Sequence, residues 1–519
     1  MLPLSPQPTP SSLWFYHHRQ ARVAVCERDA MSLFQITRAR LVELGSTLVA
    51  AGLFIYFLAT RDFGFGVDPG LHHAFAEELA RGGQWPIGQT YNLLGGMADY
   101  PPGAHLLAII AGAPFSSTLQ GIFIVAAGAV VLGYLALFGI SRHHSSAHTT
   151  AALAVFIVII LATRKSRAYL GNEIIGNFFF SQLVGTAMML FAFLVLVRMR
   201  GAKFTIWVLV AVAATHILAW VYPLSAVQFA AAAVFLQMIE VEDMPRQAFV
   251  KTTSTTAALG ISILLHPTFY GMVHNAAHDG AIVFAGWFIA LLIVGTSTAT
   301  VFLSFNRPIG ERRFGPLSAL AFGLCAVATL QAVAYYGLGL GSPYAIKKHG
   351  FAIGTVGAMI AAHLFTQLPA INRFLSKAKM PNWVSPFSAI VSCVFLVLVV
   401  GSVFIARRSA PVAEMVRYDK ELRQLMSAAE SNKFLGSNAF SNVTLPAHQN
   451  FTVAAARLQQ TRGVIDQQQR TMIKNQDNAS VARYVIVSDT VTTNQNCIMA
   501  TSTSLKIIRA DCAKLRDRE

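Results

Sequence analysis

Long apolar segments follow one another from residue 41 to residue 406 and constrain the fold of this 519-residue chain more than any other feature. An apolar run of about 18 or more residues can cross the hydrocarbon core of a bilayer as a helix. Within lipid, every backbone amide and carbonyl group must be hydrogen-bonded inside the protein, so these segments should be helical. A transmembrane β-barrel would instead show shorter segments of alternating polarity. The sequence therefore predicts an all-α polytopic membrane protein.

We expect about eleven membrane-spanning helices, with boundaries uncertain by a few residues. They are predicted at residues 41–60, 118–140, 148–163, 177–197, 204–221, 223–239, 252–271, 281–303, 316–337, 350–368 and 386–406. The apolar segment 103–115 is too short to cross a bilayer, so we expect it to form an interfacial or re-entrant helix.

Arginine and lysine residues predict the orientation, because they concentrate in the cytoplasmic connections of membrane proteins. Basic residues precede the first span and gather again around Arg198, around Arg312 and around Lys377. Eleven alternating spans place all these groups on one side, whereas counting 103–115 as a further span does not. We therefore expect a multi-pass protein of a bacterial cytoplasmic (inner) membrane, with a cytoplasmic N-terminus and a periplasmic or extracellular C-terminus.

The composition agrees with a membrane protein and argues against a nucleic-acid-binding one. Hydrophobic residues make up 54% of the chain and charged residues only 12%, about half the charged fraction of a typical soluble domain. The net charge is +16, but the basic residues lie mostly in short connections between apolar segments. No basic stripe carries the interleaved aromatic residues that bind single strands, so we expect no nucleic-acid partner.

Three regions differ in character along the chain. Residues 1–40 form a cytoplasmic N-terminal segment that is Pro-rich at its start and expected to be partly disordered, and Met31 is an alternative start. Residues 41–406 form the transmembrane domain, whose first outer loop, 61–117, is its largest. Residues 407–519 are rich in Asn, Gln, Ser and Thr and are expected to form a soluble extracytoplasmic domain.

The C-terminal region reads as a small α/β module. Residues 412–432 and 452–475 place apolar side chains at helical spacing, and 484–489 and 505–511 resemble strands. No short internal repeat, heptad pattern or Walker motif is found in the chain.

The five cysteines fall into two groups. Cys26, Cys325 and Cys393 lie near the N-terminus or within apolar segments and are expected to be inert packing residues. Cys497 and Cys512 lie in the polar C-terminal region. If that region faces an oxidising compartment, a disulfide between them is expected.

Acidic and histidine side chains gather in the first outer loop. Asp62, Asp68 and Asp99 lie there together with the adjacent His72 and His73. A carboxylate just beyond the first span is well placed to act at the membrane surface. Asp68 also fits a helix N-cap, because a proline at the first helical position follows it, and the two roles can coexist.

Two basic clusters lie in connections expected to face outside, against the usual bias. They comprise Arg164, Lys165 and Arg167, and Lys347, Lys348 and His349. Contact with anionic lipid headgroups is one explanation, and binding of a phosphate near a helix N-terminus is another. Two such clusters together favour a phosphate-bearing substrate.

Histidines further along the chain are ambiguous. His266, His274, His278 and Asp279 share one outer connection, but their spacing matches no zinc pattern, so polar loop residues are the favoured interpretation. His216 lies near the outer end of its predicted span. An ionisable group at that depth suggests a functional site, although a packed histidine is the simpler interpretation.

The arrangement resembles the GT-C superfamily of membrane glycosyltransferases. The resemblance rests on an early aspartate in a large first outer loop, on many further spans, and on a soluble outer module at the end of the chain. At the motif level it rests on DPGLHH (68–73), YPPGAH (100–105), NFFFSQ (177–182) and YAIKKHGF (344–351). The YPPG stretch is similar to one in actinobacterial arabinofuranosyltransferases, but the subfamily is not assigned.

The resemblance implies inverting sugar transfer from a polyprenyl-phosphate donor to an envelope glycan or glycolipid acceptor. Asp68 is the expected general base, with Asp62 and then Asp99 as alternatives. The two basic clusters are expected to bind the donor phosphate, Lys347 and Lys348 first. Residues expected to contact sugar or acceptor are His72, His73, Trp85, Tyr100, His105, His216, His266 and Asp279. The paired-acid metal motif of some members is not evident, so a divalent metal is not indicated.

Three other functions stay open at this point. A transporter or flippase of a lipid-linked or anionic substrate would predict repeated halves and broken midplane helices, and no convincing repeat is found. A glycan polymerase or ligase typically carries its large outer loop late in the chain, whereas here it follows the first span. A scaffold without activity would tolerate loss of Asp68.

Overall fold

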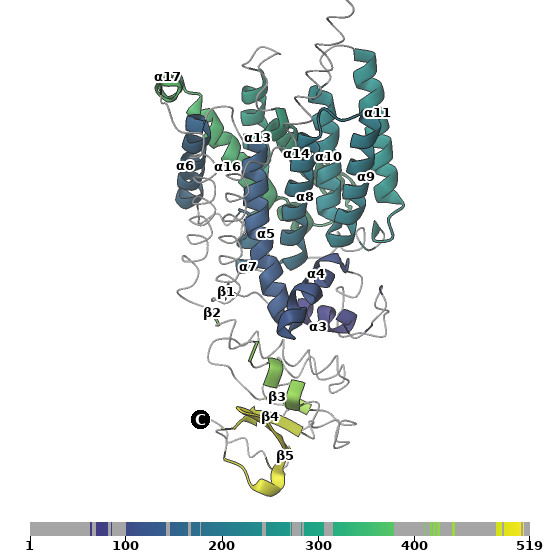
Figure 1. The fold of residues 1–519 in the computed structure, drawn as a ribbon, viewed down its shortest axis with the longest axis vertical. Helices are drawn as coiled ribbons and strands as arrows, with labels where there is room; N and C mark the ends of the chain where they lie inside the picture. The colour runs from purple at the N-terminus through teal and green to yellow at the C-terminus, as the bar shows by residue number, and fades with distance from the viewer. Residues whose placement is uncertain are drawn as a thin grey trace, which may run out of the picture. The chain divides into compact units, whose positions relative to one another are not determined.

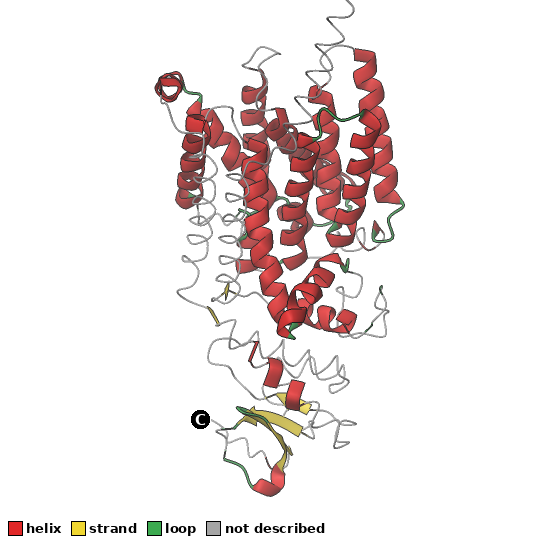
Figure 2. Cartoon of the chain, viewed as in Figure 1, coloured by secondary structure: helices red, strands yellow, loops and turns green. Residues whose placement is uncertain are grey.

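Helices dominate the part of the chain that the computed structural model describes (Figures 1 and 2). The described residues are 63–64, 69–80, 82, 85, 100–141, 146–163, 168–176, 178–240, 245–269, 271, 282, 285–305, 315–377, 409–410, 416–417, 419–421, 423–425, 439–441, 484–489, 492–509 and 512. The predicted spans 41–60 and 386–406, the predicted helix 452–475 and the N-terminal segment 1–40 lie outside them.

The predicted spans within the described residues coincide with long helices. These are α5 (Thr118–Ser141), α6 (Ser146–Ala162), α8 (Phe180–Arg198), α9 (Phe204–Val221), α10 (Pro223–Glu240), α11 (Pro245–Leu264), α13 (Gly286–Phe305), α14 (Gly315–Leu338) and α16 (Gly350–Thr366). Six helical segments of the described chain are long and apolar enough to cross a membrane. They are Thr118–Ser141, Phe180–Arg198, Phe204–Val221, Gly286–Leu303, Gly315–Leu338 and Pro343–Thr366. The polytopic helical architecture is therefore confirmed, and the count of eleven spans stays a prediction.

The boundaries of the predicted span 252–271 differ most from those of the observed helix. We expected a helix at 252–271, but α11 runs from Pro245 to Leu264. Its first turns carry polar residues, including Gln247 and Lys251, which a hydropathy criterion excludes from a span although they are compatible with a helix.

Small residues allow the helices to pack closely. Helix α5 packs against α4 and α8, and α10 packs against α14. A β-carbon at Gly121 of α5 would clash with the carbonyl oxygen of Ala108 in α4, and one at Gly323 of α14 would clash with the backbone of Ala232 in α10. Close backbone approach of this kind is a main source of helix association in lipid.

Short elements lie in the connections. They are β1 (Phe63–Gly64), α3 (Pro69–Ala80), α4 (Gly103–Gly112) with the 3-10 helix η2 (Ala113–Phe115), α7 (Asn172–Gly176), α15 (Pro343–Lys348), α17 (Pro369–Lys377) and β2 (Ser409–Ala410). Strand β1 pairs with β2 in antiparallel orientation. The predicted interfacial segment 103–115 is helical throughout, as α4 and η2. On α4, Ala104 and His105 are buried, whereas Leu106 and Ile110 are exposed.

The C-terminal region contains a four-stranded sheet with the order β3-β4-β6-β5. Its strands are β3 (Ala439–Ser441), β4 (Tyr484–Ser488), β5 (Ile498–Thr501) and β6 (Leu505–Arg509), with the 3-10 helix η5 (Gln495–Cys497) before β5. Strands β3 and β4 are parallel, and the other pairs are antiparallel. The two strands expected from sequence are β4 and β6. The domain boundary at 407 stays a prediction.

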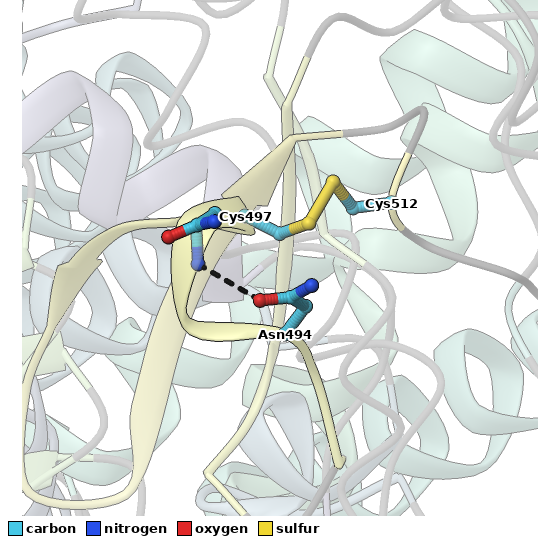
Figure 3. The surroundings of a disulfide bond; sticks show 4 residues. Asn494, Cys497 and Cys512 are labelled. Atoms are coloured by element: carbon cyan, nitrogen blue, oxygen red, sulfur yellow. Dashed lines mark hydrogen bonds between the residues drawn. A yellow bond between two sulfur atoms is a disulfide. The ribbon is translucent and has the colours of Figure 1, made fainter.

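A disulfide joins Cys497 and Cys512, the pair named from the sequence (Figure 3). Cys497 ends η5, and its amide donates a hydrogen bond to the carbonyl oxygen of Asn494 at 2.9 Å. The disulfide ties the turn before β5 to the chain just after β6. Cys325 is buried in α14 with a free thiol.

Candidate functional site

Helix α15 places two lysines at its C-terminal end. Ser342 caps the helix, its hydroxyl accepting a hydrogen bond from the Ala345 amide at 3.2 Å, and Pro343 occupies the first position. Both residues are typical of a helix start. Lys347 and Lys348 lie in the last turn, where a positive charge is favoured by the helix dipole.

Three aromatic rings surround the ammonium group of Lys348. Its Nζ atom lies 4.4 Å from the ring centroid of Tyr344, 5.3 Å from that of Phe179 and 6.0 Å from that of Tyr222. Such contacts stabilise a cation by about 0.5–2 kcal/mol each. Phe179 precedes α8, and Tyr222 joins α9 to α10. We call Lys348, Tyr344, Phe179 and Tyr222 the Lys348 cluster.

The backbone of Lys348 is fixed as well. Its carbonyl oxygen accepts a hydrogen bond from Nε2 of Gln182 at 2.8 Å. Gln182 and Phe179 belong to the motif NFFFSQ, and Lys348 and Tyr344 belong to YAIKKHGF. The structure thus brings together two motifs that are more than 160 residues apart in the sequence.

His72 of α3 lies close to the Lys348 cluster. Its Nδ1 atom is 2.9 Å from Nε2 of His105 in α4, and its ring makes an edge contact with that of Tyr100 at 6.0 Å. Burial lowers the pKa of His72 to about 3, and the positive charge of Lys348 adds to this effect. Burial likewise lowers the pKa of His105. His72 is therefore a neutral hydrogen-bonding group at neutral pH.

The backbone beside His72 is strained. Phe178 has φ 56°, in the left-handed region, although it is a bulky and fully buried residue. Its ring contacts those of His72 at 6.0 Å and Phe123 at 5.9 Å. Left-handed conformations of such residues cost of order 1–3 kcal/mol and concentrate at functional sites. The turn orients the next ring, that of Phe179, toward Lys348.

A series of contacts extends from Tyr100 to His266 and His216, two histidines that were predicted as site residues. The indole Nε1 of Trp85 donates to the Tyr100 carbonyl oxygen at 2.8 Å, and its ring contacts Trp220 at 5.0 Å. Trp220 contacts His266 at 5.1 Å, and His266 contacts His216 at 4.4 Å. Residues proposed from four separate parts of the sequence thus form one connected aromatic group.

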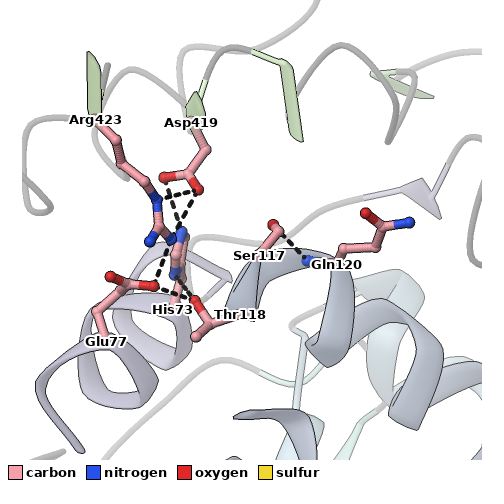
Figure 4. Close-up of polar contacts among 7 residues, drawn as sticks. All are labelled: His73, Glu77, Ser117, Thr118, Gln120, Asp419 and Arg423. Carbon is pink, nitrogen blue, oxygen red and sulfur yellow. Dashed lines mark hydrogen bonds and ion pairs between the residues drawn. The ribbon is translucent and has the colours of Figure 1, made fainter. Parts of the chain in front are cut away.

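His73, the neighbour of His72, faces a buried ionic network (Figure 4). Its Nε2 atom lies 3.1 Å from Oδ1 of Asp419, and its Nδ1 atom lies 3.2 Å from the hydroxyl of Thr118. Thr118 in turn donates to Glu77. Arg423 contacts both carboxylates, Glu77 at 2.5 Å and Asp419 at 3.0 Å. We call these five residues the α3 network.

Local structure favours the charged form of the two carboxyl groups in the α3 network, Glu77 and Asp419. Glu77 contacts Thr118 at the first residue of α5, where the helix dipole stabilises a negative charge. Burial alone would raise the pKa of Glu77, but the charges of His73 and Arg423 hold it below its usual value. Burial is likewise outweighed at Asp419, whose pKa the same two partners lower to about 2.

Glu173 of α7 is a buried carboxyl group in the connection before α8. Its Oε2 atom accepts a hydrogen bond from the Gly171 amide at 2.6 Å. Its Oε1 atom has no hydrogen-bond partner among the residues that the structure describes. Burial raises the pKa of Glu173 to about 8, so this group carries a proton at neutral pH.

His349 is held between two glutamines. Its Nδ1 atom lies 2.9 Å from Nε2 of Gln228, and its Nε2 atom lies 2.5 Å from Oε1 of Gln331. Both ring nitrogens therefore have partners within the protein. The phosphate-binding role expected for His349 stays a prediction, and the observed contacts fix the junction of α15 and α16.

Several predicted site residues lie outside the described residues. They are the carboxylates Asp62, Asp68, Asp99 and Asp279 and the cations Arg164, Lys165 and Arg167. Their roles stay predictions. Within the described ranges, no group of three or more His, Cys, Asp or Glu side chains could hold a metal ion.

Some residues of the site had no role assigned from the sequence. Phe179, Gln182 and Tyr344 lie inside motifs that the sequence singled out, so the motifs were a usable signal for them. Tyr222 stands alone between two apolar segments. Asp419 and Arg423 have the spacing of an ordinary solvated pair on a helix, and only the tertiary structure shows them to be buried together with Glu77.

Two solved structures are similar to this chain. One is ArnT from Cupriavidus metallidurans bound to undecaprenyl phosphate, with 11% identity, a TM-score of 0.46 and coverage of 93% of this chain and 100% of ArnT. The other is the same enzyme in the apo state, with 11% identity, a TM-score of 0.46 and coverage of 91% and 97%. At this level of similarity no residue of the present chain is assigned a role.

No protein-family model matches the sequence. No curated protein matches it either.

Proposed function

We propose that this protein is an inverting glycosyltransferase of the membrane. It moves a sugar from a polyprenyl-phosphate donor to a cell-envelope glycan or glycolipid on the outer face. The observation that carries the proposal is the position of Lys348, whose ammonium group lies among three aromatic rings at the end of α15.

The Lys348 cluster suits the phosphate of such a donor. The leaving group of the reaction is a lipid-linked phosphate, which needs charge stabilisation more than protonation. An ammonium group in surroundings of low dielectric interacts with an anion more strongly than it would in water. Lys347 on the same helix turn, and the cations Arg164, Lys165 and Arg167, are further candidates for this phosphate.

Asp68 is the proposed general base. The acceptor hydroxyl oxygen attacks the anomeric carbon of the donor sugar and its proton passes to the Asp68 carboxylate. The bond from the anomeric carbon to the phosphate oxygen breaks, and the phosphate leaves with both electrons. Helix α3, which carries His72, begins one residue after Asp68. Asp62 and Asp99 remain the alternative bases.

Aromatic and histidine side chains provide the sugar-binding surface. Tyr100 and Trp85 offer ring faces, and neutral His72 and His105 offer hydrogen-bonding groups. Sugars present both apolar faces and hydroxyl groups, so this combination fits them. His73, His216, His266 and Asp279 stay in the proposal as residues for the sugar or the acceptor.

The prenyl chain is proposed to lie in lipid beside α4. This helix buries His105 on one face and exposes Leu106, Leu107 and Ile110 on the other. An apolar helix face exposed at the membrane boundary accommodates lipid chains without a desolvation cost. The sugar-phosphate headgroup would then meet the buried face.

A transfer assay tests the proposed function. Purified full-length protein is given a panel of polyprenyl-phosphate sugars and envelope glycan acceptors, with Asp68→Asn alongside the wild type. We expect the wild type to transfer sugar and a folded Asp68→Asn variant to lose at least about a hundredfold in rate. Activity retained in the variant would move the base to Asp62 or Asp99. Absence of both turnover and co-purifying lipid phosphate would favour a transporter.

The orientation has its own test. Single cysteines introduced near residues 85 and 450 are expected to react with a membrane-impermeant reagent from outside. Protection of both positions would place the proposed site on the cytoplasmic side and contradict the proposal.

A further inference from the structure

A helical segment of the C-terminal region contacts α3 on one side and the sheet on another. Its described residues are 416–417, 419–421 and 423–425, and we call it the linker helix. Asp419 and Arg423 are four residues apart and share one face, which meets α3. Glu421 points to the opposite face, because it is two residues away from each of them.

Glu421 attaches the linker helix to the turn between β5 and β6. Its Oε2 atom accepts hydrogen bonds from the Ser504 amide at 2.9 Å and from the Ser502 hydroxyl at 3.3 Å. Both serines lie in the turn between β5 and β6. The linker helix thus connects this turn to the first outer loop.

Both ring nitrogens of His73 have partners in the α3 network. The carboxylates of Asp419 and Glu77 both contact Arg423. The Thr118 hydroxyl donates its proton to Glu77 and also contacts His73 Nδ1 at 3.2 Å. His73 Nε2 faces the Asp419 carboxylate at 3.1 Å. The His73 ring is therefore held from both sides.

The α3 network pairs the cation Arg423 with two carboxylates, Glu77 and Asp419. The side chains of His73 and Asp419 are each 1% exposed. Removing one partner from such a buried set leaves an uncompensated charge. Loss of a single member should therefore disrupt the geometry of the whole network.

We propose that Asp419 and Arg423 are positioning residues that clamp α3 through His73 and Glu77, and thereby keep His72 of the same helix against His105 and the ring of Tyr100. The inference deepens the proposed function, since it makes the C-terminal region a working part of the transferase site. The linker helix would carry any movement of the sheet to α3, because Glu421 ties it to the turn after β5.

Hydrogen exchange of α3 in the full-length protein tests the clamp without reference to activity. The variants are Arg423→Gln and Asp419→Asn. The matched control is Lys420→Gln on the same helix, whose side chain is exposed. We expect the peptide that covers 69–80 to exchange at least about tenfold faster in both test variants and at the wild-type rate in the control. Unchanged exchange in both test variants would overturn the clamp.

Transfer kinetics test the positioning role. We expect kcat of Arg423→Gln to fall by about a hundredfold while KM for the donor stays within about threefold, since Lys348 is untouched and small misplacements of a site are costly. Arg423→Lys keeps the charge but lacks the planar fork that contacts two carboxylates, so it should be intermediate. Faster exchange of α3 with an unchanged kcat would refute positioning. If the wild type transfers no sugar and carries no lipid phosphate, the proposed function fails, and the exchange experiment still decides the clamp.

Discussion

The Nε2 atom of His73 lies 3.1 Å from Oδ1 of Asp419, across 346 residues of sequence. This contact joins α3 to the region after the last predicted span. His72, one residue earlier on α3, lies beside His105. Two adjacent histidines therefore have different surroundings: His73 belongs to the buried ionic network, and His72 is neutral and packs against His105.

Replacement of Lys348 by methionine should weaken donor binding. The variant keeps an unbranched side chain among the rings of Tyr344 and Phe179 but loses the charge. Loss of one partner of a largely desolvated charge pair costs about 2 kcal/mol or more, which is about a thirtyfold rise in the donor KM. The measurement is a donor titration in the transfer assay.

Two further lysines provide the comparison. Lys347→Met should cause a smaller rise in the donor KM, because none of the cation–ring contacts around Lys348 involves it. Lys377→Met changes an exposed lysine at the end of α17 and should match the wild type. A Lys348→Met variant with the wild-type donor KM would remove Lys348 from the phosphate site.

Glu173→Gln should change how stability depends on pH. Burial raises the pKa of Glu173 from 4.5 to about 8 in the folded state. Between these values the unfolded chain loses the proton and the folded chain keeps it, so the stability contribution is greatest below pH 4.5 and is lost as pH rises to about 8. The variant cannot ionise, so its Tm relative to the wild type should rise across this range. A Tm difference that is independent of pH would show that Glu173 ionises normally.

Gly121→Ala should separate α4 from α5. A β-carbon there would clash with the backbone of Ala108, and overpacking of this kind costs about 1–3 kcal/mol. Thermal unfolding in detergent should show a lower Tm and, because α4 carries His105, a lower transfer rate. Gly295→Ala on α13 meets no atom within 4 Å and should leave both quantities close to wild type. Equal effects of the two substitutions would argue against the close contact.

Cys512→Ser should loosen the C-terminal sheet. The disulfide closes a loop of 15 residues, and a cross-link of that size stabilises by about 3 kcal/mol. Hydrogen exchange of the peptides that contain β4 and β6 should therefore accelerate, whereas α5 should be unaffected. Exchange at the wild-type rate throughout would mean that the sheet does not depend on the cross-link.

Much of the helical architecture was predictable because lipid imposes it. Length and hydropathy alone located α5, α8 and α14, since a span must be apolar over its whole length. The same criterion misplaced the start of α11, where Gln247 and Lys251 are helical although polar. Strands β4 and β6 were predictable from their short runs of β-branched and other apolar residues.

The site was only partly predictable, because it consists of tertiary contacts. His72, His105 and Lys348 were named from their motifs, but nothing in the sequence places Tyr222 beside Lys348. The pairing of Asp419 with His73 is equally invisible, since a charged pair at helical spacing usually faces solvent. Single-sequence patterns report local periodicity, and the buried ionic network depends on contacts across 346 residues.

The anomeric configuration of the transferred sugar tests the central claim most directly. A polyprenyl-phosphate donor of known configuration is incubated with the wild-type protein and an acceptor glycan, and the product linkage is determined by NMR. A single displacement with Asp68 as base predicts a product of inverted configuration. A product of retained configuration, or a protein that consumes no lipid-linked donor and binds none, would contradict the account.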